Sequence, residues 1–75
     1  MNILDLGSVV RVLDDRNFRV LEIDSFRHRD GTTTWVLIEY PFGQEFASRS
    51  FCTKRAAMDA AMVTLATRKL QGKIK

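Results

Sequence analysis

One stretch near the carboxyl end decides the fold: residues 53–72, with the sequence TKRAAMDAAMVTLATRKLQG. Thr53 can accept hydrogen bonds from the free backbone N–H groups of a first helical turn, and Gly72 can adopt the left-handed conformation that ends a helix. The residues between them are mostly good helix formers. The stretch therefore predicts one long helix over residues 53–71.

One side of this helix is apolar. At about 100° per residue, five small or flexible side chains fall on the same stripe: Ala57, Met58, Ala61, Met62 and Leu65. Alanine lets a helix lie close to a sheet, and methionine fills irregular gaps in a core. We expect this stripe to pack on a sheet formed by the residues before the helix.

The residues before the helix are typical of strands. Residues 33–40 contain Thr, Trp, Val, Ile and Tyr, which favour a pleated surface, and predict a central strand. Residues 18–26 predict a second strand, in which the neighbouring apolar residues Val20 and Leu21 indicate a bulge. Residues 41–44 predict a turn. Residues 45–52 predict the last strand, which leads directly into Thr53.

Residues 3–14 allow two interpretations. Apolar residues recur at helical spacing after Asn2, which predicts a short N-terminal helix. Gly7 would weaken such a helix, and residues 9–13 are equally typical of a strand that forms a hairpin with residues 18–26. We favour the strand. The fold class is α+β: a three- or four-stranded antiparallel sheet with the C-terminal helix packed on one face, and with the N-terminal helix as the alternative.

Length and composition favour one small cytoplasmic domain. The chain has 75 residues, 45% hydrophobic and 28% charged, so we expect a single domain over residues 1–75 with residues 72–75 as a frayed basic tail. Cys52 is the only cysteine, which excludes an intramolecular disulfide and favours a reducing compartment. The sequence has neither a signal-peptide pattern nor an apolar run of about 20 residues that could span a membrane.

Residues suited to catalysis are few. His28 is the only histidine and stands in a turn between two arginines, which makes it a poor general base. Ser48, Ser50 and Cys52 carry nucleophilic atoms, but no neighbour in the sequence would activate them. One histidine and one cysteine cannot form a zinc site by themselves, and the glycines are too few for a phosphate-binding loop. We therefore expect no enzymatic activity, no metal and no cofactor.

The charge distribution favours an anionic partner. The formal net charge is +3, and residues 53–75 hold six basic residues against one acidic residue. Lys54 and Arg55 open the helix, where the helix dipole is already positive. A phosphate at this end would be favoured by the two side chains and by the dipole. The sequence predicts contacts to the phosphate backbone of a nucleic acid. The candidate residues are Lys54, Arg55, Arg49, Arg27, His28 and Arg29.

The run from Thr53 to Ala61, after antiparallel strands, resembles the end of a double-stranded-RNA-binding domain, where paired basic residues open an alanine-rich helix. The resemblance implies that Lys54 and Arg55 contact phosphates. It also implies the order helix, three strands, helix if residues 3–14 are helical, with His28 in the loop that reaches the minor groove. The Gly-Pro-X-His loop of that family is missing from this sequence.

Residues 51–57 after the strands also resemble the AP2-like arm-type DNA-binding domains of phage tyrosine recombinases. In that family the sheet enters the major groove, so the resemblance implies that exposed strand residues such as Arg49 would read it.

The alternative function is binding to another protein. A small accessory factor of a phage or mobile element could block a host protein with its sheet face or with the back of its helix. An acidic residue that neutralises Lys54 and Arg55 would favour this alternative over nucleic acid. A back stripe of the helix is also apolar enough to predict a homodimer surface, formed by Ala56, Ala60, Val63 and Leu70.

Overall fold

The computed structural model describes residues 2–40 and 47–74, with side chains up to Thr67. In the described residues, five strands form one antiparallel sheet in the order of the sequence, and one helix follows them. The α+β class and the C-terminal helix are therefore confirmed. The elements are β1 (Asn2–Asp5), β2 (Val10–Leu13), β3 (Arg19–Arg27), β4 (Thr33–Glu39), β5 (Ala47–Phe51) and α1 (Lys54–Ile74).

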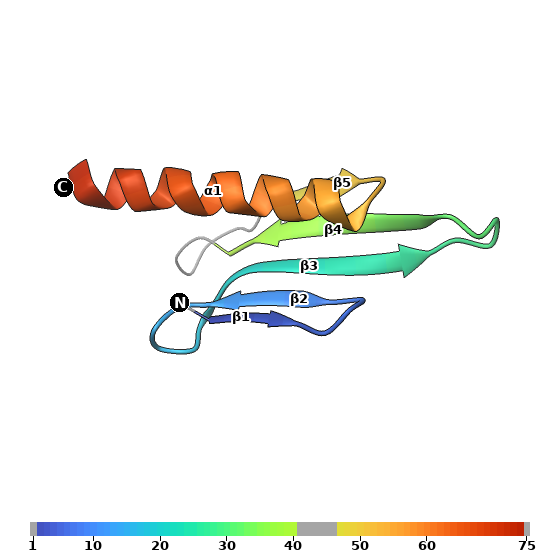
Figure 1. The fold of residues 1–75 in the computed structure, drawn as a ribbon, viewed down its shortest axis with the longest axis horizontal. Coiled ribbons are helices and arrows are strands. Elements are labelled where there is room, and N and C mark those ends of the chain that lie inside the picture. The colour runs from blue at the N-terminus through green and yellow to red at the C-terminus, as the bar shows by residue number, and fades with distance from the viewer. Residues whose placement is uncertain (1, 41–46, 75) are drawn as a thin grey trace.

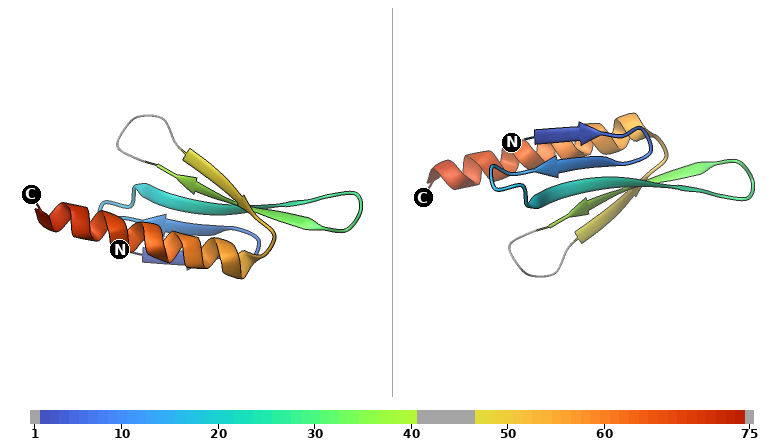
Figure 2. Two further views of the ribbon diagram at one scale, coloured as in Figure 1. Left: turned by 90° about the horizontal axis from the view of Figure 1, so that it is seen from above. Right: turned by 90° about the horizontal axis from the view of Figure 1, so that it is seen from below.

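The helix covers one face of a strongly twisted sheet. Figure 1 shows α1 running along the sheet, with the tip of the β3–β4 hairpin projecting past the start of the helix at one end and the last turns of α1 projecting at the other. Figure 2 shows that β4 and β5 cross the direction of β1 and β2, as the right-handed twist of strands requires. The β1–β2 hairpin is thereby turned relative to the strands on which α1 packs, which are β3, β4 and β5.

The core lies between α1 and the middle of the sheet. The register places Val10 opposite Ile23 and Ile23 opposite Leu37, so one side chain from each of three neighbouring strands points to the helix. Each fully buried side chain of this size contributes about 1.5–3 kcal/mol relative to exposure. The buried apolar residues are Val10, Val12, Leu21, Ile23, Leu37, Ala57 and Ala61.

The start of α1 is as the sequence predicts, but its end is not. Thr53 Oγ1 accepts a hydrogen bond from the backbone N–H of Ala56 at 3.1 Å, which confirms the N-cap. The prediction that Gly72 ends the helix is wrong, because α1 continues to Ile74. Glycine inside a helix costs about 1 kcal/mol relative to alanine, which is too little to stop a helix of this length by itself.

Residues 3–14 form strands, so the alternative of an N-terminal helix is wrong and the sheet has five strands instead of three or four. The conformation of Gly7 explains why residues 3–14 form strands and not a helix. Its φ of 88° lies in the left-handed region, where glycine is favoured, and its N–H donates to Asp5 Oδ1 at 2.9 Å. The turn closes with a hydrogen bond from Leu6 N–H to the carbonyl of Val9 at 2.8 Å. The order helix, three strands, helix is therefore not present.

The predicted irregularity in the second strand is confirmed. Val12 pairs with Leu21, whereas Leu13 pairs with Arg19, so Val20 is the extra residue of β3 at this point. Such a bulge increases the local twist of the strand. The predicted turn over residues 41–44 and the first two residues of the predicted last strand lie outside the described residues.

Candidate functional site

A surface groove runs between the β1–β2 hairpin and α1. The side of the helix stripe that faces β3 and β4 is covered, because Ala57 is 0% and Ala61 is 4% exposed. The side that faces β1 is not covered. Met62 is 57% exposed on α1, and Ile3 is 51% exposed on β1, although both side chains line the same groove. The sequence predicts Met62 as a core residue, and the structure leaves it at the margin of the core.

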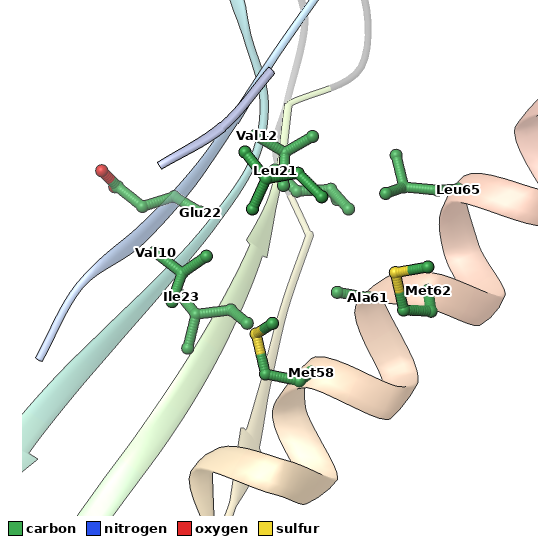
Figure 3. Close-up of a pocket in the computed structure, with 10 residues that line it drawn as sticks. Val10, Val12, Leu21, Glu22, Ile23, Met58, Ala61, Met62 and Leu65 are labelled. Atoms are coloured by element: carbon green, nitrogen blue, oxygen red, sulfur yellow. The ribbon is translucent and has the colours of Figure 1, made fainter. Parts of the chain in front are cut away.

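The groove is apolar and shallow. Figure 3 shows side chains of α1 and of the strands β2 and β3 facing each other across it, while the carboxylate of Glu22 points away from the helix. Its enclosed volume is only ≈ 10 Å³, so the groove is an open surface and not a cavity for a small molecule. The apolar lining residues are Ile3, Val10, Val12, Leu21, Ile23, Met58, Ala61, Met62 and Leu65.

An ion pair links the end of β1 to the start of α1, the two elements that flank the groove. Lys54 Nζ lies 2.9 Å from Asp5 Oδ1, at the end of β1, and 5.9 Å from the centre of the Trp35 ring. The hydrogen bond from Lys54 lowers the pKa of Asp5 below its ordinary value, and the N–H of Gly7 acts in the same direction. The charge of Lys54 is therefore compensated within the chain. The condition that favours the protein-binding alternative is met for Lys54 but not for Arg55.

Arg55 differs from its neighbour Lys54. Its side chain is exposed, and none of the ion pairs formed by the described residues includes it. Residues at i, i+3 and i+7 share one side of a helix, so Arg55 lies on the same side as Met58 and Met62. Among the residues that the structure describes, Arg55 is therefore a cation without a carboxylate partner, near the start of α1.

Arg49 holds β5 against α1. It pairs with Leu37 in the sheet register, which places it on the face covered by the helix. Its Nη2 lies 3.4 Å from Thr64 Oγ1, and its guanidinium lies 5.7 Å from the centre of the Phe51 ring. These contacts direct the guanidinium toward this chain's own helix.

Arg27, His28 and Arg29 lie at the tip of the β3–β4 hairpin. All three are exposed, and neither arginine belongs to an ion pair among the residues that the structure describes. The turn is held by a hydrogen bond from His28 N–H to the carbonyl of Thr32 at 2.8 Å, and the His28 ring bonds to Thr34 Oγ1. Figure 1 shows this tip at the same end of the molecule as the start of α1.

A buried carboxylate lies on the other face of the sheet. Glu22 is 5% exposed, and its Oε1 accepts from Arg11 Nε at 3.1 Å and from Arg19 Nη1 at 3.4 Å. Its Oε2 accepts from the Tyr40 hydroxyl at 3.2 Å. Desolvation, and then the charge of Glu22, raise the pKa of Asp24 and of Tyr40. The strand alternation of β3 could have placed Glu22 opposite the core, but not predicted its partners.

The apolar back stripe of the helix is not one exposed surface. Ala60 is half-buried and packs against the core, and Ala56 is also half-buried. Val63 is 67% exposed. The side chain of Leu70 lies outside the described residues. A homodimer through these residues stays a prediction.

Comparisons of this chain with protein-family models, with curated proteins and with solved structures found no match. Among the described residues, the single helix is too polar for its length to cross a membrane. The same residues contain no cluster of three His, Cys, Asp or Glu side chains that could hold a metal ion.

Proposed function

We propose that this protein is a small non-catalytic module that binds another protein through the apolar groove between β1 and α1. The exposure of Ile3 and Met62 carries this proposal, because both side chains line one groove and are more than half exposed. Scattered exposed apolar residues are ordinary on protein surfaces, whereas a contiguous apolar patch is typical of an interaction site.

Covering the groove would supply part of the free energy that specific binding requires. Burial of a large apolar side chain contributes about 1.5–3 kcal/mol when it is complete. Ile3 and Met62 are half covered already, so they would contribute roughly half of that each, and Met58 and Leu65 would add smaller amounts. A partner would also have to overcome the free energy of association, so it must make further contacts around the groove.

The compensation of Lys54 is the reason why a protein partner is favoured over a nucleic acid. A protein binds a nucleic-acid backbone when its cations neutralise phosphates and so release the counterions of the nucleic acid. Lys54 already has Asp5 as its partner. Arg49 is directed toward Thr64 and Phe51. Of the six candidate residues, these two are therefore poorly suited to meet a phosphate.

The test of the groove uses two adjacent residues of α1. The wild-type chain, carrying an affinity tag, captures partners from a nuclease-treated extract of its organism of origin. The variants Met62→Lys and Val63→Lys are used in parallel. Both positions are exposed, but only Met62 lines the groove. We expect the captured protein to be lost with Met62→Lys and retained with Val63→Lys. Equal retention by both variants would contradict the groove as the binding surface.

Nucleic-acid binding is the second candidate, and the exposed arginines of the β3–β4 tip favour it. Arg27 and Arg29 are free of ion pairs in the described residues, and Arg55 lies at the same end of the molecule. A two-stranded ribbon is narrow enough to enter the major groove of a duplex. Binding to a duplex should then weaken steeply with salt, and the double change Arg27→Ala and Arg29→Ala should weaken it. If the chain binds neither immobilised DNA nor immobilised RNA at low salt, nucleic-acid binding is ruled out.

A further inference from the structure

We propose that the occupant of the groove is an extended segment of the partner protein, which adds to the free edge of β1, places alternate apolar side chains against Met58 and Met62, and carries an acidic residue at the end beside Arg55. This inference rests on the proposed function, because it identifies the kind of partner that the groove accepts.

The edge of β1 supplies the backbone partners for such a segment. In the described sheet β1 pairs only with β2, so the backbone groups on its outer side meet no strand, and all four of its residues are exposed. Natural edge strands are usually blunted by charges, proline or a covering loop, because they template further strands. The only charged residue of β1, Asp5, is held by Lys54. An extended chain can therefore pair with β1 without meeting an unpaired charge on that strand.

The groove has the length that a short added strand requires. A strand rises about 3.3 Å per residue, so the four residues of β1 span about 13 Å. A helix rises 1.5 Å per residue, so Met58 and Leu65 are about 10 Å apart along α1. Side chains on one face of a strand recur about every 7 Å. An added strand would therefore place two or three alternate side chains over the groove, beside Ile3.

The shape of the groove disfavours other classes of occupant. Drug-sized ligands require pockets of about 300–1,000 Å³, whereas this groove encloses ≈ 10 Å³. An amphipathic helix could cover Met62, but all of its backbone groups would be paired internally, so the edge of β1 would stay unpaired. An extended segment satisfies the backbone edge and the apolar side chains together.

Charge complementarity fixes one end of the segment. The ion pair of Lys54 and Asp5 is neutral, and Arg55 beside it has no carboxylate partner among the described residues. The helix dipole is also positive at this end, so a carboxylate from the partner is favoured there. Asp59, one turn further along the same rim, would repel a second carboxylate. The segment should therefore carry its acidic residue at one end, next to an uncharged alternating run.

The first experiment selects the occupant without assuming its sequence. A displayed library of random twelve-residue peptides is selected on the full chain and counter-selected on Met62→Lys. We expect the enriched peptides to alternate apolar and polar residues, with one acidic residue at an end. Enriched apolar residues at spacings of three and four would show that the groove binds a helix, which overturns the strand and leaves the proposed function standing. No enrichment would contradict both.

The second experiment tests the backbone and the charge on one synthesised peptide from that selection. N-methylation of its alternate backbone nitrogens on the pairing edge should lower the affinity at least about tenfold, because β-pairing needs those N–H groups. Arg55→Glu should also lower the affinity at least about tenfold, whereas Arg16→Glu, the same charge change in the distant β2–β3 turn, should not. Two peptides are made, each N-methylated on one edge. If neither modification lowers the affinity, strand addition is overturned.

A second copy of this chain is the remaining occupant, and the same variants exclude or reveal it. We expect sedimentation of the wild-type chain to show a monomer at the concentrations used for peptide binding. A dimer that Met62→Lys dissociates and Val63→Lys does not would place a second copy in the groove, and would overturn the inference that a different protein supplies the strand.

Discussion

Glu22 is buried although it lies on the sheet face that α1 does not cover. Burial of a carboxylate is costly unless its lone pairs are satisfied, and here Arg11, Arg19 and Tyr40 all donate to it. The guanidinium of Arg19 also lies 5.6 Å from the centre of the Tyr40 ring. These contacts join β2, β3 and the end of β4 on the open face. The cluster is therefore a structural feature of the sheet.

Replacing Glu22 should destabilise the fold. Glu22→Ala leaves two arginines and a tyrosine hydroxyl without their acceptor, and we expect a loss of about 2 kcal/mol in the free energy of unfolding. Urea unfolding measures it, with Asp59→Ala on the exposed side of α1 as the control, expected within about 0.5 kcal/mol of the wild type. A Glu22→Ala variant as stable as the control would contradict this role.

Asp24 should make stability depend on pH in the opposite sense to an ordinary ion-paired carboxylate. Its folded pKa is raised by desolvation and by Glu22, so the folded state binds its proton more tightly than the unfolded state. The stabilisation by protonated Asp24 is present at low pH and is lost as pH rises through the folded pKa. Asp24→Asn should therefore stabilise the domain near pH 7, and this gain should shrink as the pH falls below the raised pKa. A gain that is the same at pH 7 and in acid would contradict it.

At the scale of the elements, α1 lies close to the sheet because small residues face it. Ala57 and Ala61 are buried against the sheet, and the longer side chains of Met58, Met62 and Leu65 line the groove. The same spacing that predicts the helix also predicts this contact. What the sequence does not contain is the position at which the helix crosses the twisted sheet.

Enlarging Ala57, which packs against the sheet, should displace the helix. Ala57→Leu adds volume where Ala57 is 0% exposed, and we expect a loss of about 1–3 kcal/mol in the free energy of unfolding. Ala66→Leu, at an exposed position of the same helix, is the matched control and should change stability by less than about 0.5 kcal/mol. Thermal unfolding of both variants measures the difference in stability. Equal melting temperatures would show that Ala57 does not limit how closely α1 approaches the sheet.

Gly72 offers a test of where α1 ends. Because α1 continues to Ile74, Gly72→Ala should increase the helical signal in circular dichroism and stabilise the chain by a few tenths of a kcal/mol, up to about 1 kcal/mol. If Gly72 instead occupied a left-handed position at the end of the helix, alanine there would destabilise the chain. The sign of the change therefore distinguishes the two conformations.

Most elements could be predicted from local patterns, and the exceptions have a physical cause. The helix start, the strand over residues 33–40 and the bulge at Val20 follow from capping, β-propensity and broken alternation. The sequence does not predict the strand β1, because four residues with two apolar side chains carry almost no periodic signal. Helical spacing across residues 3–14 arises there because two short strands are separated by a turn at Gly7.

The candidate site was less predictable than the fold. The basic residues could be found by counting charges, but the pairing of Lys54 with Asp5 joins residues 49 positions apart and depends on how β1 meets α1. The exposure of Met62 has the same origin, since only the twist of the sheet decides which margin of the helix stripe is covered. Neither feature leaves a local signal in the sequence.

At the scale of the whole molecule, the two candidate surfaces are separate. The apolar groove is lined by residues of β1, β2, β3 and α1, whereas the tip of the β3–β4 hairpin projects beyond the helix start (Figures 1 and 2). The radius of gyration is 13.1 Å, and the longest dimension is 47 Å, with the projecting tip and the end of α1 at opposite ends. Changes at Arg27 and Arg29 can therefore be made without altering the groove, and changes at Met62 without altering the tip, whereas Arg55 lies between the two surfaces.

Amide chemical-shift mapping of the isotope-labelled chain with the selected peptide tests the groove most directly. We predict that the largest shifts fall on β1 and on the turns of α1 from Met58 to Leu65, and that β1 amides gain protection from hydrogen exchange. The tip residues 26–32 should be unchanged. Shifts confined to that tip, or to the open face around Glu22, would contradict the groove as the surface through which this protein binds its partner.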